Sequence, residues 1–143
     1  MKRLDHAIIF LFIAGAYVPF ALKLLSNAWG ISVLSVVGGL AGVGFMTTLA
    51  LPAPRRWIRV GLYVGLGWVG IVAIPEWLTM LPREAFAMLI LSGILFSGGG
   101  MVYATRRPDP LPHVFGYHEV FHSLQIAATA VLYSVVAIYV LRP

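Results

Sequence analysis

The sequence predicts an all-α membrane protein, a bundle of five transmembrane helices in a single domain that covers residues 1–143. Hydrophobic residues make up 60% of the chain and charged residues only 10%, against about 45–50% and about 25% in soluble domains. This small number of charged side chains cannot cover a surface that faces water. Lipid must therefore surround most of the molecule. Because a helix needs about 20 apolar residues to cross a bilayer, 143 residues hold five such helices but no separate soluble domain.

Five apolar runs along the chain are each long enough to cross the bilayer. The predicted helices cover residues 6–23, 29–51, 60–80, 85–105 and 118–141. Barrel strands are excluded, because they need only about 9–11 residues of alternating character. Pro19 and Pro75 are expected to kink the first and third helices, since proline lacks the N–H that a helix interior uses.

The basic residues between the runs predict the orientation of the chain. The side that holds the amino terminus carries seven of them, namely Lys2, Arg3, Arg55, Arg56, Arg59, Arg106 and Arg107. The opposite side carries three, Lys23, Arg83 and Arg142. Cytoplasmic loops are rich in lysine and arginine, so we expect a cytoplasmic amino terminus and an external carboxyl terminus in the inner (plasma) membrane. The net charge of +5 therefore reflects orientation, and we expect membrane lipids rather than nucleic acid as partners.

Aromatic and acidic residues at the ends of the runs predict contacts with the membrane interface. Trp29, Trp57 and Trp77 are interpreted as anchors of an aromatic belt. Glu76 follows Pro75 near the outer end of the third run, and we interpret it as interfacial rather than catalytic.

Two histidines one helical turn apart form the clearest candidate site. His118 and His122 occupy positions i and i+4, which places both imidazoles on one face of a helix with Cβ atoms ~5–6 Å apart. This spacing lets two imidazoles bind one metal ion such as zinc. The alternative is a pair of structural histidines that hydrogen-bond to their neighbours. The chain has no cysteine, so thiolate ligands and disulfides are excluded.

The same residues also fit a second type of metal site. His118-Glu119-x-x-His122 is the zincin signature, in which the glutamate activates a metal-bound water. Zincin-like sites usually take a third ligand from downstream, yet no histidine, aspartate or glutamate follows His122. Asp5 offers a different partner, because it opens the first helix on the side where His118 opens the fifth. It would orient a metal-bound water, or alternatively cap the amino terminus of its own helix.

Three segments resemble the signatures of a known family. The residues are Leu4-Asp5-His6 with Ile9-Phe10-Leu11 and Ile13-Ala14-Gly15-x-Tyr17-x-Pro19-Phe20, then Gly67-Trp68, then Phe115-Gly116-x-His118-Glu119-x-Phe121-His122. They resemble, in this order, the third, fifth and seventh helices of the hemolysin III family. That family belongs with the adiponectin and progestin receptors in one superfamily of seven-helix membrane proteins. The resemblance implies that this chain is a partial seven-helix fold, matching the third to seventh helices.

The resemblance also implies a zinc ion near the cytoplasmic mouth of the bundle. By position, His118 and His122 would be two metal ligands and Asp5 would hold a zinc-bound water, whereas Glu119 has no catalytic counterpart. The implied chemistry is hydrolysis of a lipid amide such as a ceramide. The family's third ligand, a histidine of its second helix, has no counterpart in this sequence. Either the chain is a truncated gene product or fragment, or His6, water, another copy of the chain or a partner supplying the missing helices completes the site. With two protein ligands alone, such a site would hold zinc substoichiometrically.

Two classes of function follow from these observations. The first is a zinc-binding remnant or fragment of a lipid-amide hydrolase, with Asp5 positioning the attacking water. The second is a non-enzymatic regulator of membrane homeostasis, or a pore-forming, cytolysin-like protein. A conducting pathway should show a polar stripe along a helix, and no run here has one, which argues against a wide pore.

Overall fold

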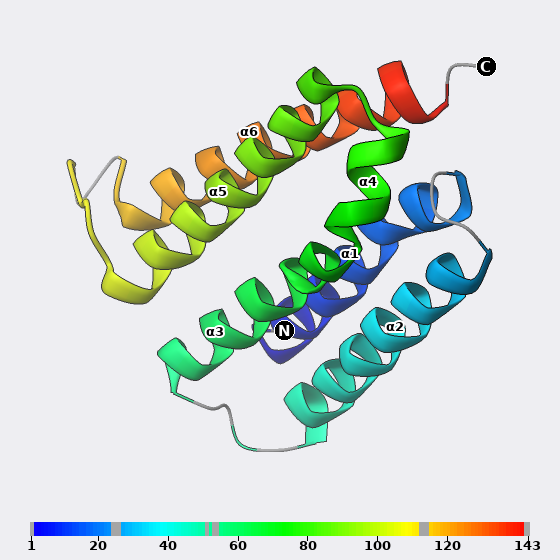
Figure 1. Cartoon of the computed structure of the whole chain (residues 1–143). Helices are drawn as coiled ribbons and strands as arrows, with labels where there is room; N and C mark the ends of the chain where they lie inside the picture. The colour runs from blue at the N-terminus through cyan, green and yellow to red at the C-terminus, as the bar shows by residue number, and fades with distance from the viewer. Residues whose placement is uncertain (1, 24–26, 51, 53–54, 112–114, 142–143) are drawn as a thin grey trace. The chain divides into compact units, whose positions relative to one another are not determined.

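The computed structural model describes residues 2–23, 27–50, 52, 55–111 and 115–141, with the side chains of all of these except residues 2, 3, 5 and 27. The chain divides into two compact units, Met1–Leu81 and Pro82–Pro143. Both are built from helices (Figure 1), and among the described residues the only β-type pairing is an isolated bridge between Leu111 and Phe115.

Five helical segments are long and apolar enough to cross a membrane, which confirms the predicted fold class. They are His6–Lys23, Ala28–Ala50, Arg56–Met80, Arg83–Thr105 and Tyr117–Val140. The third segment begins four residues earlier than the run of apolar residues suggests. Arg56 and Arg59 lie in its first turns, where long arginine side chains keep their charge near water while the stems cover apolar surface.

In the first unit, α1 (Lys2–Lys23) and α2 (Asn27–Ala50) pack along each other (Figure 1). The buried residues at the contact between these two helices recur every three or four positions, because only such positions share one face of a helix. On α2 the buried residues are Gly30, Val33, Val37, Ala41 and Gly44. The ring of Phe10 from α1, only 4% exposed, lies directly over Gly44, where a Cβ atom would overlap it. The missing side chain of Gly44 is therefore what lets the two helices approach here.

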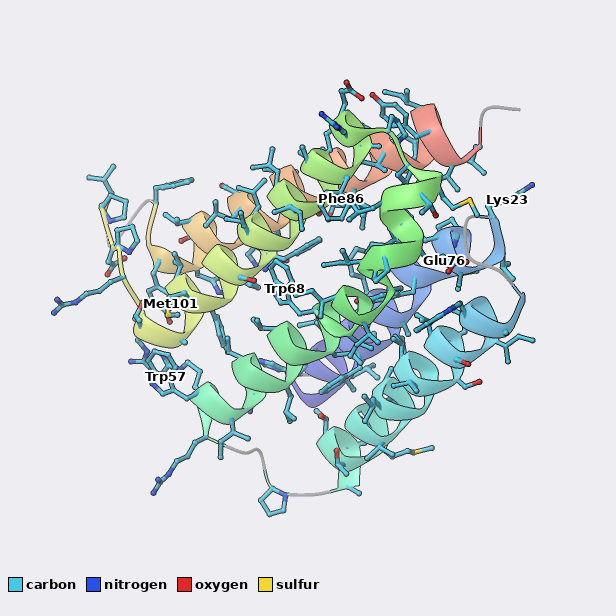
Figure 2. The ribbon with its side chains drawn as sticks, in the orientation of Figure 1. Lys23, Trp57, Trp68, Glu76, Phe86 and Met101 are labelled. Atoms are coloured by element: carbon cyan, nitrogen blue, oxygen red, sulfur yellow. The ribbon has the colours of Figure 1, made fainter. Side chains whose placement is uncertain are left out.

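The third membrane segment is not one helix but three pieces. These are α3 (Arg56–Gly67), the 3-10 turn η1 (Val69–Ala73) and α4 (Ile74–Met80) (Figure 1). Trp57 lies at the start of α3 and Trp68 directly after its end (Figure 2). The break precedes Pro75, whose ring in a continuous helix would meet the carbonyl of Ile71 and leave it without a donor. By contrast, α1 continues through Pro19 without interruption.

The hydroxyl of Tyr17 on α1 reaches the backbone at this break. It donates a hydrogen bond to the carbonyl of Gly67 at 2.5 Å and lies 3.3 Å from the carbonyl of Leu66. It also accepts a hydrogen bond of 3.0 Å from the N–H of Gly70. Backbone groups freed at membrane depth need partners, because lipid offers none. One side chain from α1 supplies them for the broken segment.

The second unit pairs α5 (Arg83–Thr105) with α6 (Tyr117–Val135), which ends in the π-helical turn η2 (Val136–Val140). The two helices run antiparallel (Figure 1), and small residues line their contact, as is usual between membrane helices. The buried residues of α5 are Ala85, Ser92, Gly99, Gly100 and Ala104. The buried Ser92 hydroxyl donates to the carbonyl of Ala128 on α6 at 3.0 Å, so the pair is joined by a hydrogen bond as well as by packing.

Most other serines and threonines of the membrane segments are satisfied by their own helix. Their hydroxyls donate to the carbonyl four residues earlier, at 2.7–2.9 Å; these residues are Ser32, Thr47, Thr48, Ser97, Thr105, Ser123, Thr129 and Ser134. Such hydroxyls need no partner in lipid or water.

Candidate metal centre

The histidine pair lies in the first turns of α6, and acidic side chains hold the start of this helix. The N–H of Gly116 donates to Oε2 of Glu119 at 2.9 Å, and the N–H of Tyr117 donates to Oδ1 of Asp109, also at 2.9 Å. The first N–H groups of a helix have no partners within it, and negative charge is favourable there. These two bonds fix where α6 begins and thereby the position of His118.

The imidazoles of His118 and His122 face each other across one turn of α6. Their Nε2 atoms are 3.1 Å apart, and the ring centroids are 4.5 Å apart with the planes perpendicular. Both side chains are exposed. The ring of Phe121 lies beside both, with centroid distances of 6.2 Å to His118 and 5.0 Å to His122.

This geometry fits a shared zinc ion. Two nitrogen ligands of a tetrahedral zinc, each about 2.0–2.1 Å from the metal, are separated by about 3.3–3.4 Å. The observed 3.1 Å between the two Nε2 atoms needs only a small adjustment to reach that separation. The same distance also suits a hydrogen bond from one ring to the other, which is the structural alternative. Two imidazoles already converge here, so no large rearrangement would precede metal binding.

Glu119 has a role that weighs against the zincin interpretation. Its carboxylate accepts the N–H of Gly116 and so acts as a cap of α6. Its backbone carbonyl accepts the hydroxyl of Ser123 at 2.9 Å. A glutamate that serves as general base should be directed at a metal-bound water, whereas this one stabilises the helix that carries the histidines.

Asp5 lies within α1, which begins at Lys2, so it is not the N-cap of that helix. Its side chain lies outside the described part of the structure. Asp5 belongs to the first unit and the histidine pair to the second, so their pairing stays a prediction. Among the described residues, no group of three histidine, cysteine, aspartate or glutamate side chains forms a metal site.

A tyrosine that the sequence analysis did not single out holds the start of α1. The hydroxyl of Tyr63 on α3 donates to the backbone carbonyl of His6 at 2.8 Å. Its ring meets Phe10 edge-on, with a centroid distance of 4.8 Å. The turn of α1 that contains Asp5 is therefore tied to the third segment. In the sequence, Tyr63 could have been noticed as a lone tyrosine among aliphatic residues, four positions before Gly67-Trp68.

A family model described as haemolysin-III related matches residues 1–133, which include Asp5, His118 and His122. The chain belongs to this family. Together with the five apolar helices, this makes it a multi-pass membrane protein and confirms the resemblance found in the sequence.

Named relatives fall in two groups. "Hemolysin-3 homolog" of Bacillus subtilis (strain 168) is 28% identical over 142 residues, which cover 99% of this chain and 64% of the relative. "Hemolysin-3" of Bacillus cereus is 32% identical over 140 residues, covering 96% and 60%. "Adiponectin receptor protein" of Drosophila melanogaster is 32% identical over 149 residues, covering 92% and 33%. The chain thus spans less than two thirds of the length of these relatives, and no solved structure matches it.

Proposed function

We propose that this member of the haemolysin-III related family is a zinc-binding membrane protein whose metal ligands are His118 and His122. The observation that supports the proposal best is the 3.1 Å separation of the two Nε2 atoms on one face of α6. The capped start of the helix and the neighbouring ring of Phe121 hold both imidazoles near this arrangement. Both rings are exposed, so no other described side chain of the second unit covers them.

The reaction that we propose for this site is hydrolysis of a lipid amide such as a ceramide. Zinc, when bound, acts as a Lewis acid toward a carbonyl or a water molecule. Asp5 is the carboxylate that we assign to orient the attacking water and take up its proton. Glu119 contributes indirectly, because its bond to Gly116 fixes the helix that bears the two histidines.

We further propose a cell-membrane location with a cytoplasmic amino terminus and an external carboxyl terminus. Seven basic residues on one side of the membrane against three on the other support this orientation. Lipids are the partners in direct contact, and a second copy or another chain would supply a further metal donor. The competing functions are a non-enzymatic regulator of the bilayer and a pore-former. The hydroxyl groups satisfied within their own helices weigh against a pore, since they leave no polar stripe.

Metal analysis of the detergent-purified full chain tests the proposal. We expect zinc below one ion per chain, easily removed by a chelator, and visible absorption with near-tetrahedral character when cobalt replaces it. His118→Ala and His122→Ala should each abolish binding, whereas Ser123→Ala, next to His122 on the same helix, should not. Asp5→Asn should weaken binding only about 10–100-fold, as is usual for a carboxylate that supports a ligand without touching the metal. Acidification should release the ion, because protonated imidazoles cannot bind it.

The proposal fails if wild-type chain dialysed against excess zinc retains no more metal than His118→Ala. It also fails if both histidine variants retain as much metal as the wild type. In either case the two histidines are a structural pair, and a function without metal replaces the hydrolase.

A further inference from the structure

The break in the third membrane segment places two hydrogen-bonding arrangements in competition for the same atoms. In a continuous α-helix, the N–H of Gly70 would donate to the carbonyl of Leu66, and that of Ile71 to the carbonyl of Gly67. In the structure, Ile71 donates instead to Trp68 at 3.0 Å. The hydroxyl of Tyr17 takes over the carbonyls of Leu66 and Gly67 and the N–H of Gly70. Either arrangement satisfies these backbone groups.

We propose that the third segment is a two-state element and that the Tyr17 hydroxyl latches it in its broken form. The two states are the 3-10 turn over η1 with Tyr17 engaged, and a continuous α-helix with Tyr17 released. The latch rests on hydrogen bonds within the first unit and uses none of His118, His122 and Asp5.

The size of the movement follows from helix geometry. The five residues of η1 turn through about 600° and rise about 10 Å at 3-10 spacing, but turn through about 500° and rise about 7.5 Å in an α-helix. Conversion would therefore rotate α4 by about 100° relative to α3 and draw it about 2.5 Å closer. Every side chain of α4 would change direction.

Trp77 is a side chain of α4 that packs against other parts of the first unit. Its ring lies against Gly70, where an added Cβ would fall 2.5 Å from the indole and 3.0 Å from the ring of Tyr17. It also lies 6.3 Å from the ring of Phe20, measured between centroids. The indole of Trp77 can pack here only because residue 70 is glycine. A rotation of α4 would move the indole away from Gly70.

Each of the two states carries its own costs. Pro75 and the Tyr17 hydroxyl favour the broken form, since proline inside a continuous helix loses a hydrogen bond and clashes with the preceding turn. The broken form leaves the buried indole N–H of Trp77 without a hydrogen-bond partner among the described residues. It also maintains five residues of 3-10 turn, longer than the usual three to four and with poorer hydrogen-bond geometry.

The rotation of α4 would change the surface at one end of the first unit. Glu76 is the single acidic residue of the third segment and sits on α4 next to Trp77 (Figure 2). Its side chain is partly buried in the broken form. Rotation of α4 would turn this carboxylate to a new direction at the end where Phe20 lies, near the last turn of α1. The movement would thus change both the charge and the shape that this end presents.

Spin labels on α1 and α4 of the full chain test the latch, and the absence of native cysteine makes labelling simple. Leu22→Cys and Leu78→Cys place labels at exposed positions. We expect one main distance in the wild type and a second in Tyr17→Phe, with the ratio of the two forms shifted about 3–20-fold, the range for one hydrogen bond between membrane helices. Pro75→Ala should shift the ratio in the same direction while keeping the hydroxyl, and the double variant should favour the second distance.

Tyr63→Phe is the matched control, because it removes a tyrosine hydroxyl of the same unit that donates to the carbonyl of His6. It should keep the wild-type distance. The latch is wrong if Tyr17→Phe and Pro75→Ala both show the single wild-type distance. It is equally wrong if Tyr63→Phe gives the second distance, or if the variants show only a broad continuum, since a two-state element requires two discrete distances.

Discussion

Replacing Gly44 by alanine tests the close approach of α1 and α2. A Cβ on Gly44 would fall 2.6–2.7 Å from Cδ1 and Cζ of Phe10 and closer still to Cε1. Phe10 cannot yield freely, because it is buried and its ring packs edge-on against Tyr63. Overpacking of this kind costs about 1–3 kcal/mol. Alanine also gains about 0.5–1 kcal/mol over glycine within a helix, so the net loss of stability should be at most about 2.5 kcal/mol.

Gly42→Ala on the same helix separates the two effects. A Cβ at Gly42 meets nothing within 4 Å, so only the helical gain applies there. The difference between the two variants should therefore equal the overlap alone, about 1–3 kcal/mol. Denaturant or thermal unfolding in one detergent, compared at one scan rate, measures it. Adding Phe10→Leu to Gly44→Ala should recover part of the loss. Equal midpoints for Gly42→Ala and Gly44→Ala would refute the packing of Phe10 over Gly44.

Two further predictions concern orientation and the second unit. In intact cells, Arg55→Cys should be protected from an impermeant thiol reagent and Arg83→Cys should be labelled, because they lie on opposite sides of the third segment. The reverse pattern would overturn the proposed orientation. Ser92→Ala should destabilise the chain by about 0.6–1.7 kcal/mol through loss of the bond to Ala128. Ser97→Ala should be nearly neutral, since that hydroxyl bonds within its own helix, and equal losses in the two variants would contradict this assignment.

The sequence was sufficient to predict the membrane segments because lipid imposes a length and an apolar composition on each one. All five can be read from hydropathy, and the main difference is at Arg56 and Arg59, which are charged yet helical. Apolar composition does not distinguish an unbroken helix from a broken one. Pro75 marks the place of the break, but its form depends on Tyr17, which is distant in sequence.

The histidine pair could be predicted because the helical repeat alone places residues i and i+4 on one face. The cap by Glu119 is equally local, three residues from Gly116, and its signature was present in the sequence. The pairing of Asp5 with His118 is of a different kind. It requires the mutual position of segments more than a hundred residues apart, which no local pattern fixes. It stays a prediction, as does zinc binding itself.

The contact between Tyr17 and the break has a consequence for biosynthesis. The hydroxyl bonds to residues 49–53 positions further along the chain. At a synthesis rate of about 5–20 residues per second, α1 exists for roughly 3–10 s before those residues are made. During that interval the phenol lacks the backbone partners that it has in the folded chain. By the time the third segment is made, Tyr17 is already in place to receive it. The broken shape of that segment therefore has its hydrogen-bond partner only once it lies against α1.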